Sequence, residues 1–243
     1  MKVILNVLCE GQTEERFVNK VLKNYLKEFG IVVKAQILVT NRKKSCQGGM
    51  LSYNQVKRDL STWMKQCENT TNEKYYYTTM FDFYALPNDF PGYAEAFKAS
   101  DCYERIQLLE RGFTKDISSP HFIPYIQLHE FETLVFCGLD YLLDDYPDIE
   151  RQIENLKKVV ETKYFNNPEL INTRPETAPS RRIIKEFENY HHYNKPKSGE
   201  LVTSKLGIDK LKEKCKHFKE WVEKLEKIAL SPQNNRTSVT SCL

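Results

Sequence analysis

The fold of this chain is decided by the stretch Val3-Ile4-Leu5-Asn6-Val7-Leu8-Cys9-Glu10-Gly11-Gln12-Thr13-Glu14-Glu15. It opens as an apolar run that is long enough for a buried strand and too short to span a membrane. Gly11 then allows the backbone to turn sharply, and apolar residues recur at helical spacing from Phe17 to Phe29. A strand that leads at once into a helix places Glu10 at the carboxyl end of the strand, where open α/β sheets bind ligands.

The position of Glu10 needs a chemical explanation, because a carboxylate at the end of a buried strand is partly desolvated. Such a group requires a cation, a hydrogen-bond donor or a shifted pKa. Glu14 follows one helical turn later, so two or three carboxylates could converge, which is the oxygen arrangement that binds Mg²⁺. The alternative is an ordinary first turn, in which Thr13 caps the helix and Glu14 and Glu15 face the positive end of its dipole.

Two further predicted strands also end in acidic residues. The aromatic and threonine-rich residues 75–83 predict a strand that delivers Asp82, and residues 122–128 predict another that leads to Glu130 and Glu132. If the sheet is parallel, these acids share one rim with the acid of the first strand. If the chain stays extended after residue 128, Glu130 and Glu132 also point to the same side.

Length, charge and cysteine content limit the class of protein to which this chain can belong. A length of 243 residues suits one large domain, or one domain with a helical appendage. The formal net charge of +3 neither requires nucleic acid nor argues against it. Seven cysteines without a C-x-x-C pair are more consistent with a reducing compartment than with disulfides or a zinc site. With no signal peptide and no membrane-spanning run, we expect a soluble, cytoplasmic protein without a membrane partner.

Basic residues on several loops and helices are candidates for binding phosphate. Lys43 and Lys44 lie in a polar loop that contains a glycine pair, and Lys197 lies in a later polar segment. Arg181 and Arg182 fall in the first turn of a predicted helix, with Ser180 as its cap, where arginines oppose the helix dipole. Phosphate or an acidic neighbour would explain these arginines, and simple exposure is the alternative reading of each basic group.

Beyond residue 140 the character of the chain changes. Charged helical segments are predicted at 148–162, 180–190 and 208–228, and the last carries a clear apolar stripe. We therefore expect an α/β domain over residues 1–140 and a helical extension packed on it over 141–230. Residues 231–243 are polar and without periodicity, which predicts a flexible tail.

Several motifs together resemble a known family. The chain resembles proteins of unknown function with a TOPRIM-like domain, similar to the TOPRIM nuclease part of OLD-type proteins, whose members often appear beside an ATPase in bacterial defence loci. The resemblance rests on residues 8–14, Phe81-Asp82-Phe83-Tyr84 with Pro87 and Pro91-Gly92, residues 124–132, Pro179-Ser180-Arg181-Arg182, and Cys215-x-His217-Phe218-x-x-Trp221.

The resemblance implies a central, mostly parallel sheet flanked by helices, with Mg²⁺ or Mn²⁺ held by acids at the strand ends. Glu10 matches the signature glutamate of the first strand, and Asp82 matches the first acid of an Asp-x-Asp motif. Tyr84 stands where the second aspartate is expected, so one metal ligand is missing. The side chains that could replace this ligand are Glu14, Asp89, Glu130 and Glu132.

The leading functional hypothesis is metal-dependent cleavage of phosphodiester bonds in DNA or RNA, in an anti-phage defence system with a partner ATPase of the AAA or ABC type. In it, Glu10 and Asp82 bind metal, Glu130 and Glu132 bind a second metal or position water, and Glu14 supports them. A second hypothesis is a catalytically degenerate module that binds the ATPase or nucleic acid. A third is a nucleotidyl or phosphoryl transferase. No P-loop is present, so ATP hydrolysis requires another chain. The sequence leaves open whether the chain forms a homo-oligomer.

Overall fold

A parallel sheet forms the centre of the molecule. The computed structural model describes residues 1–41, 46–47, 50, 52–67, 69–171 and 175–229. In these residues the strands follow the order β2-β1-β5-β6, with β7 also pairing with β5, and every pairing in this sheet is parallel. The strands are β1 Lys2–Cys9, β2 Ile31–Ile37, β5 Glu73–Asp82, β6 Phe122–Ile123 and β7 Ile126–Gln127. A small antiparallel hairpin, β3 Val39–Asn41 with β4 Cys46–Gln47, follows β2.

Strand β1 occupies an interior position because its sequence suits burial on both faces. Seven of its eight residues are buried, and it pairs along its length with β2 on one side and β5 on the other. Near-continuous apolar runs of this kind are typical of parallel strands covered on both faces by helices. The predicted α/β class with a mostly parallel sheet is therefore confirmed.

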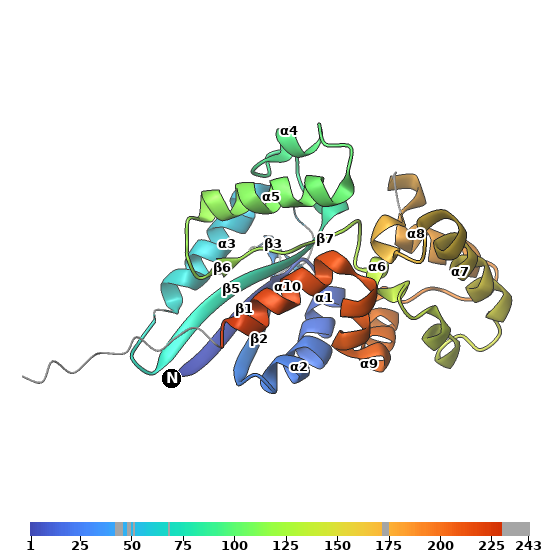
Figure 1. Ribbon diagram of the computed structural model, residues 1–243, viewed down its shortest axis with the longest axis horizontal. Coiled ribbons are helices and arrows are strands. Elements are labelled where there is room, and N and C mark those ends of the chain that lie inside the picture. The colour runs from blue at the N-terminus through green and yellow to red at the C-terminus, as the bar shows by residue number, and fades with distance from the viewer. Residues whose placement is uncertain (42–45, 48–49, 51, 68, 172–174, 230–243) are drawn as a thin grey trace, which may run out of the picture.

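Helices cover both faces of the sheet (Figure 1). On one face lie α3 Tyr53–Gln66, α4 Tyr93–Ala96 and α5 Cys102–Ile117. On the other lie α1 Gln12–Phe17, a π-helical turn at Val18–Leu22, α2 Lys23–Lys27 and α10 Lys216–Lys227. Each face has its own cluster of buried apolar side chains.

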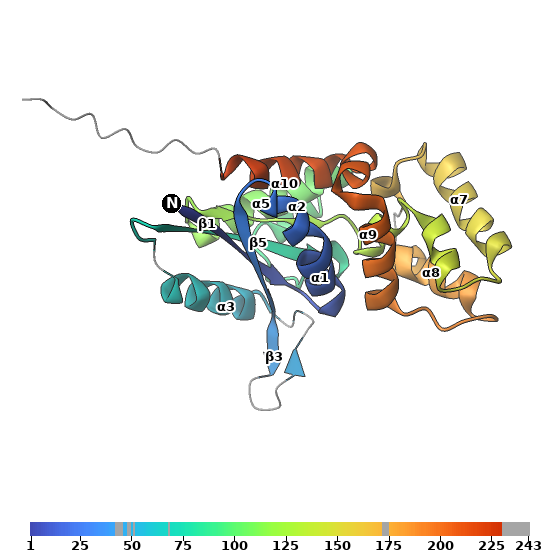
Figure 2. The same ribbon diagram turned by 90° about the horizontal axis from the view of Figure 1, so that it is seen from below.

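The remaining helices gather beyond the carboxyl ends of the strands. They are α6 Glu132–Val135, α7 Glu150–Tyr164, α8 Pro179–Phe187 and α9 Lys195–Lys214, with short 3₁₀ turns at Leu139–Asp144, Pro168–Leu170 and Pro175–Thr177. Figure 2 shows α9 between α1 and the α7–α8 pair. One apolar cluster includes side chains from β1 and from α7 to α10, so the core is continuous across residue 140. The expected division there stays a prediction, and the expected flexible tail lies outside the described residues.

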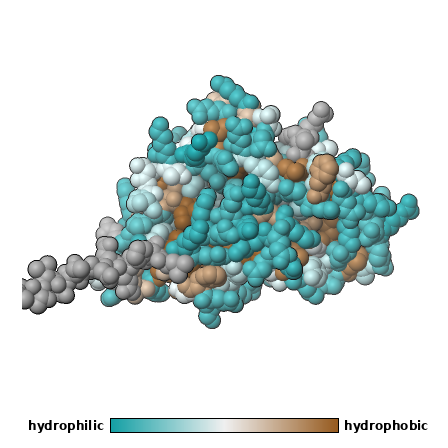
Figure 3. All heavy atoms as spheres, viewed as in Figure 1, coloured by the Kyte–Doolittle hydropathy of each residue, from teal (hydrophilic) through white to brown (hydrophobic). Residues whose placement is uncertain are grey.

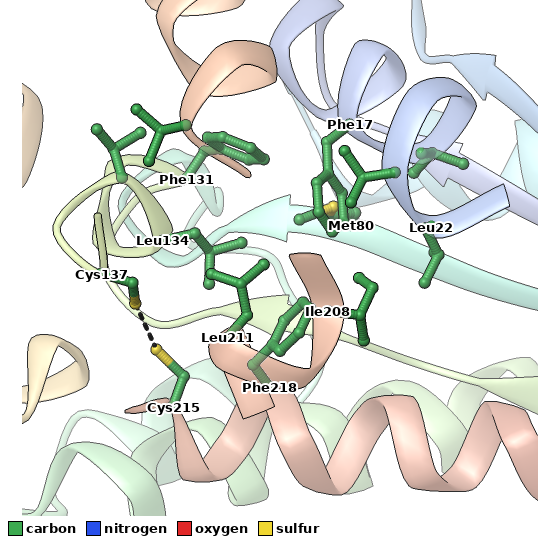
Figure 4. Packing of buried hydrophobic residues seen from close by; sticks show 14 of the residues in the cluster. Phe17, Leu22, Met80, Phe131, Leu134, Cys137, Ile208, Leu211, Cys215 and Phe218 are labelled. Carbon is green, nitrogen blue, oxygen red and sulfur yellow. Dashed lines mark hydrogen bonds between the residues drawn. The ribbon is translucent and has the colours of Figure 1, made fainter. Parts of the chain in front are cut away.

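Aromatic side chains connect the start of α6 and helix α10 to the first helix. The ring centroid of Phe17 lies 5.7 Å from that of Phe131 and 6.1 Å from that of Phe218, both edge to face. Figure 4 shows these rings together with Leu134 and Leu211. Burying one such ring contributes about 1.5–3 kcal/mol to folding.

Gly199 lets α9 approach the first helix and the turn after β7. A Cβ atom at this position would lie 2.7 Å from Cε1 of Phe131 and 3.0 Å from Cγ2 of Thr13. Contacts this short are not tolerated in a packed core, so either α9 or the Phe131 ring would have to move. The absence of a side chain at Gly199 therefore holds the start of α9 against the carboxyl edge of the sheet.

The block Cys215-x-His217-Phe218-x-x-Trp221 has a packing role in this structure. The indole of Trp221 stacks on Tyr125 at 4.2 Å and 14°, and its Nε1 donates a hydrogen bond of 2.9 Å to Oγ1 of Thr78 in β5. The ring of His217 also stacks on Tyr125, at 5.0 Å. This motif therefore fastens α10 to the central sheet.

Two sequence expectations about local structure are corrected. The predicted helix 208–228 is two helices, because Cys215 takes an extended conformation. The third main strand is interrupted at Pro124 and Tyr125, where Oγ1 of Thr79 bonds both the N–H and the C=O of Tyr125 at 3.0 Å. Proline lacks the N–H that a continuous ladder requires.

The face shown in Figure 3 is largely hydrophilic, with small and separated apolar patches. Among the helices of the described residues, none combines the length and the apolar character needed to cross a bilayer.

Candidate metal and phosphate site

The strand-end acids meet at one edge of the sheet. Glu10 follows β1, Asp82 is the last residue of β5, and Glu130 and Glu132 come after β7. The backbone N–H of Asp82 donates a hydrogen bond of 3.0 Å to Oε2 of Glu10, which joins the ends of the two strands. Parallel pairing thus brings together carboxylates that are 72 positions apart in the sequence.

Glu14 completes the turn from β1 into α1. Its Oε2 accepts a hydrogen bond of 2.8 Å from the N–H of Gly11, and Gly11, in an extended conformation, is the N-cap of the helix. The sequence expectation that Thr13 caps this helix is wrong, because Thr13 already lies inside it. The side chain of Glu14 turns inward, since only 6% of the residue is exposed.

Asp82 and Glu132 carry oxygens without hydrogen-bond partners. Within the part of the chain that the structure describes, Oδ1 of Asp82 and Oε1 of Glu132 are buried and accept no hydrogen bond. Glu132 is 2% exposed, and its Oε1 lies 3.6 Å from Nζ of Lys195, a distance too long for a hydrogen bond. Buried carboxylate oxygens in this condition are costly, and a bound cation would remove the cost.

Glu130 takes a different role from its neighbour. His129 has a φ of +64°, so the chain turns after β7, and Glu130 and Glu132 do not alternate along an extended strand. Oε2 of Glu130 accepts a hydrogen bond of 2.9 Å from the N–H of Ser180 in the first turn of α8. Ser180 is therefore not the cap that the sequence suggested; Ala178 is the N-cap, and the Glu130 carboxylate lies at the positive end of the helix.

The pKa values of this cluster show mutual repulsion in a desolvated site. Burial, and after it the charge of Glu130, raises the pKa of Glu10 to about 7. Burial raises the pKa of Glu14 to about 7, with a further contribution from Glu10, and burial similarly raises the pKa of Glu132 to about 7. The pKa of Asp82 is well above its usual value, because of burial and then of the surrounding glutamates. The site therefore holds protons near neutral pH when no cation is bound.

Lys195 is the cation that the sequence reasoning missed. It is the first residue of α9, directly after the N-cap Asn194. Burial lowers the pKa of its ammonium, but Glu132, Glu130 and Asp82 outweigh that effect, so the pKa of Lys195 is raised. A signal was present, because Asn194-Lys195-Pro196 reads as a helix start. A lysine there opposes the helix dipole, as Arg181 and Arg182 do in the first turn of α8.

The basic residues expected to bind phosphate differ in their contacts and in their exposure. Lys197 pairs with Asp145 at 2.8 Å, with 61% of its side chain exposed. Arg182 donates hydrogen bonds to the Tyr164 hydroxyl and to the carbonyl of Ile171. Arg181 is exposed in the first turn of α8. The predicted contacts of Lys43 and Lys44 fall outside the described residues.

Tyr84, at the position of the expected second aspartate, is held by His129. Nε2 of His129 lies 3.0 Å from the carbonyl oxygen of Glu169 and must donate to it. Burial lowers the pKa of His129 to about 4, so the ring is neutral and Nδ1 is an acceptor. The Tyr84 hydroxyl therefore donates to Nδ1 at 3.2 Å.

The donor chemistry fits a hard divalent cation, although the side chains have not gathered around one point. Carboxylates with raised pKa values and unpartnered oxygens are suitable ligands for Mg²⁺ or Mn²⁺. Over the described ranges, however, no three Asp, Glu, His or Cys side chains are grouped as a metal site. Asp89 is occupied elsewhere, since its Oδ1 accepts a hydrogen bond of 2.9 Å from the N–H of Tyr53 at the start of α3.

The chain belongs to the family described as "Domain of unknown function (DUF4276)", whose model matches residues 9–226. All of the described acids of the site and Lys195 lie within this match. No curated protein matches the chain. Among solved structures, it is similar to the C-terminal region of the OLD protein of Xanthomonas campestris pv. campestris. The structure phased with mercury is 15% identical, covers 93% of this chain and 96% of that chain, and gives a TM-score of 0.42. The structure phased with platinum is 14% identical, with 93% of each chain covered and a TM-score of 0.42.

Proposed function

We propose that this member of the DUF4276 family is a nuclease that hydrolyses phosphodiester bonds with the help of Mg²⁺ or Mn²⁺. The observation that supports it most directly is the desolvated acid cluster, in which oxygens of Asp82 and Glu132 lack partners and the pKa values of Glu10, Glu14 and Glu132 are about 7. Burying so many carboxylates weakens the apoprotein, so a ligand that balances their charge is expected.

Each residue has a role that its position allows. Glu10, Asp82 and Glu132 would hold the cation, with Glu14 adjusting the charge beside them. A divalent cation held by these carboxylates would neutralise charge on the phosphate and supply a more acidic water near neutral pH. Lys195, held at the same edge by α9, donates to a phosphate oxygen, and Glu130 keeps the N-terminus of α8 at the site.

In the overall reaction, water adds to phosphorus and the bond to one ester oxygen breaks. One strand end keeps the phosphate, which retains the oxygen of water, and the other leaves as a hydroxyl. One proton of water goes to the leaving ester oxygen, and the second is released to solvent when the new phosphate monoester ionises. Lys195 is suited to hold the phosphate during this exchange, because its raised pKa keeps the ammonium charged. An ammonium is a compact phosphate ligand.

A second candidate function is a binding module without catalysis. Two observations favour it: Tyr84 occupies the position of an expected acid, and the described residues contain no assembled metal site. In this reading the acid cluster binds a cation for structure, and the sheet edge binds nucleic acid or the ATPase partner that the family resemblance suggests. The role in phage defence and the ATPase remain predictions.

Two measurements test the nuclease proposal. The first is Mn²⁺ binding by calorimetry, which should weaken at least tenfold in Glu10→Gln and in Asp82→Asn. The second is cleavage of plasmid DNA, single-stranded DNA and tRNA by the purified protein in Mn²⁺. Glu28→Gln is the matched control, because it makes the same change at an exposed position far from the site.

The outcomes separate the two candidates. Mn²⁺-dependent cleavage that disappears in Glu10→Gln and persists in Glu28→Gln supports the nuclease. Mn²⁺ binding without cleavage of any substrate, with or without a partner ATPase, favours the binding module. Unchanged Mn²⁺ affinity in both acid variants defeats the metal site itself.

A further inference from the structure

An aromatic pocket adjoins the acid cluster. It has a volume of about 610 Å³, within the range of cavities that hold small molecules. Its walls come from the turn after β5, from α4 and α5, and from the residues after β7. The aromatic side chains that line it are Phe83, Tyr84, Tyr93, Phe97 and Tyr164.

Three of these rings form a stack that reaches the solvent. Phe97 lies against Tyr93 with ring centroids 4.2 Å apart at 24°, and against Phe83 at 5.9 Å and 27°. Nearly half of Phe97 is exposed, at 49%, which is unusual for a phenylalanine with no structural need for exposure. An exposed ring at the mouth of a pocket offers a flat surface to a planar ligand.

Arg105 adds a positive charge and an unused donor to the same wall. Its Cζ lies 5.5 Å from the centroid of Phe97 and 5.9 Å from that of Phe83. One terminal nitrogen donates to the carbonyl of Ala99 at 2.7 Å, while the buried Nε has no hydrogen-bond partner among the described residues. The pocket therefore combines stacking surfaces with a cation, and an anionic, planar ligand suits both.

The pocket and the acids share the same two chain segments. Tyr84 comes two residues after Asp82, and His129 comes one residue before Glu130; both line the pocket. The bond from the Tyr84 hydroxyl to Nδ1 of His129, at 3.2 Å, closes the wall between the two segments. Consecutive Cα atoms are about 3.8 Å apart, so the pocket wall begins within one nucleotide's reach of the carboxylates.

We propose that this pocket receives an unpaired nucleobase of a single-stranded nucleic acid while the adjoining phosphate lies at the acid cluster. The base packs against the exposed part of the Phe97 ring, and Arg105 faces the base and its phosphate. This proposal rests on the nuclease function above and narrows its substrate, because a base held inside a duplex cannot enter a pocket. Aromatic stacking accepts every base, so it selects strand state and not sequence.

The charged wall of the pocket favours a nucleobase over an apolar ligand. A purely apolar ligand would cover the Arg105 guanidinium, whose buried Nε has no hydrogen-bond partner among the described residues, without offering it an acceptor. A base offers ring nitrogens and exocyclic groups to such a side chain. The carboxylates beyond the Tyr84–His129 wall repel anions until a cation is bound, so entry of the phosphate depends on metal while stacking of the base does not.

Binding is therefore tested in EDTA, independently of cleavage. A fluorescent single-stranded oligonucleotide of about 12 nucleotides, within the range that one binding fold covers, is titrated with the full chain by anisotropy, in DNA and RNA forms. The same strand is measured as a duplex and with one internal abasic site moved along it. In Phe97→Ala we expect the single-strand affinity to fall about 5- to 150-fold, which corresponds to stacking of one base. Tyr190→Ala is the matched control, because Tyr190 is exposed at 54% and lies outside the pocket.

A second readout reports the pocket directly. A strand carrying 2-aminopurine should change its fluorescence on binding to the wild type and to Tyr190→Ala, and not to Phe97→Ala. Equal affinity for single strand and duplex, or equal binding by Phe97→Ala and Tyr190→Ala, overturns the pocket proposal and leaves the nuclease proposal standing. Tight binding of apolar probes with no competition by oligonucleotides also overturns it. A wild type that binds no nucleic acid in EDTA or in Mn²⁺ overturns both.

Discussion

Replacing Glu132 by glutamine should stabilise the metal-free protein, and increasingly so as the pH rises. Burial raises the pKa of this carboxyl from its ordinary 4.5 to about 7. In the unfolded chain the group ionises above pH 4.5, whereas in the folded chain it keeps its proton up to about pH 7. Folding therefore takes up a proton in this window, and the free energy of unfolding falls as the pH rises through it.

The magnitude follows from the two pKa values. Each pKa unit corresponds to about 1.4 kcal/mol, so Glu132 costs the folded protein roughly 3 kcal/mol above pH 7 and little below pH 4.5. Because glutamine does not ionise, the advantage of Glu132→Gln over the wild type should grow by about 2 kcal/mol between pH 5 and pH 8. Changes in packing, or in the ion pair with Lys195, that do not depend on pH contribute equally at pH 5 and pH 8. They therefore cancel when the advantage at one pH is subtracted from the advantage at the other.

Urea denaturation in EDTA at pH 5, 6, 7 and 8 measures this advantage. Glu28→Gln, at an exposed position, should follow the wild type at every pH. Saturating Mn²⁺ should stabilise the wild type more than Glu132→Gln at pH 8, since the metal then replaces the proton. An advantage of Glu132→Gln that is the same at pH 5 and pH 8 would refute the argument that this buried carboxyl carries a raised pKa.

Three further predictions concern the elements around the site. Lys195→Met should lower the cleavage rate at least tenfold and weaken oligonucleotide binding in Mn²⁺. Lys197→Met, two positions later and paired with Asp145, should change neither. Equal losses in the two variants would show that Lys195 has no specific role in binding phosphate. Gly199→Ala should destabilise the protein by about 1–3 kcal/mol in thermal or urea unfolding, because its Cβ would lie 2.7 Å from the Phe131 ring. A variant as stable as the wild type would show that the missing side chain at Gly199 does not hold α9 against the edge of the sheet. Arg181→Ala should reduce the salt slope of nucleic-acid binding by about 1, whereas Arg182→Ala should instead lower the melting temperature, since Arg182 bonds Tyr164 and Ile171.

Sequence patterns could predict the strand ends and could not predict the turns between them. The apolar runs before Glu10 and Asp82 indicate parallel strands, and parallel strands place both carboxylates on one edge regardless of detail. The extended alternation expected of Glu130 and Glu132 is wrong for a local reason, because a positive φ at His129 redirects the chain and no pattern of residue types requires it. Lys195 was missed for a different reason: it comes 185 positions after Glu10, and only the packing of α9 on α1 brings it to the acids.

The tyrosine in place of the expected aspartate connects the two proposals. Because Tyr84 replaces an expected metal ligand, it favours a site that has lost catalysis. The carboxylates agree with that interpretation, since no three of those in the described residues are grouped as a metal site. Yet its hydroxyl is fixed by a neutral histidine whose other nitrogen is bonded to the chain, and its ring lines a pocket that opens beside the acids. A merely decayed position would not need this support. Tyr84→Phe separates the readings, because it removes the bond to His129 and keeps the ring. Preserved base stacking with a small loss of stability assigns Tyr84 to the pocket wall, and loss of Mn²⁺ affinity in Tyr84→Phe would instead return this position to the metal site.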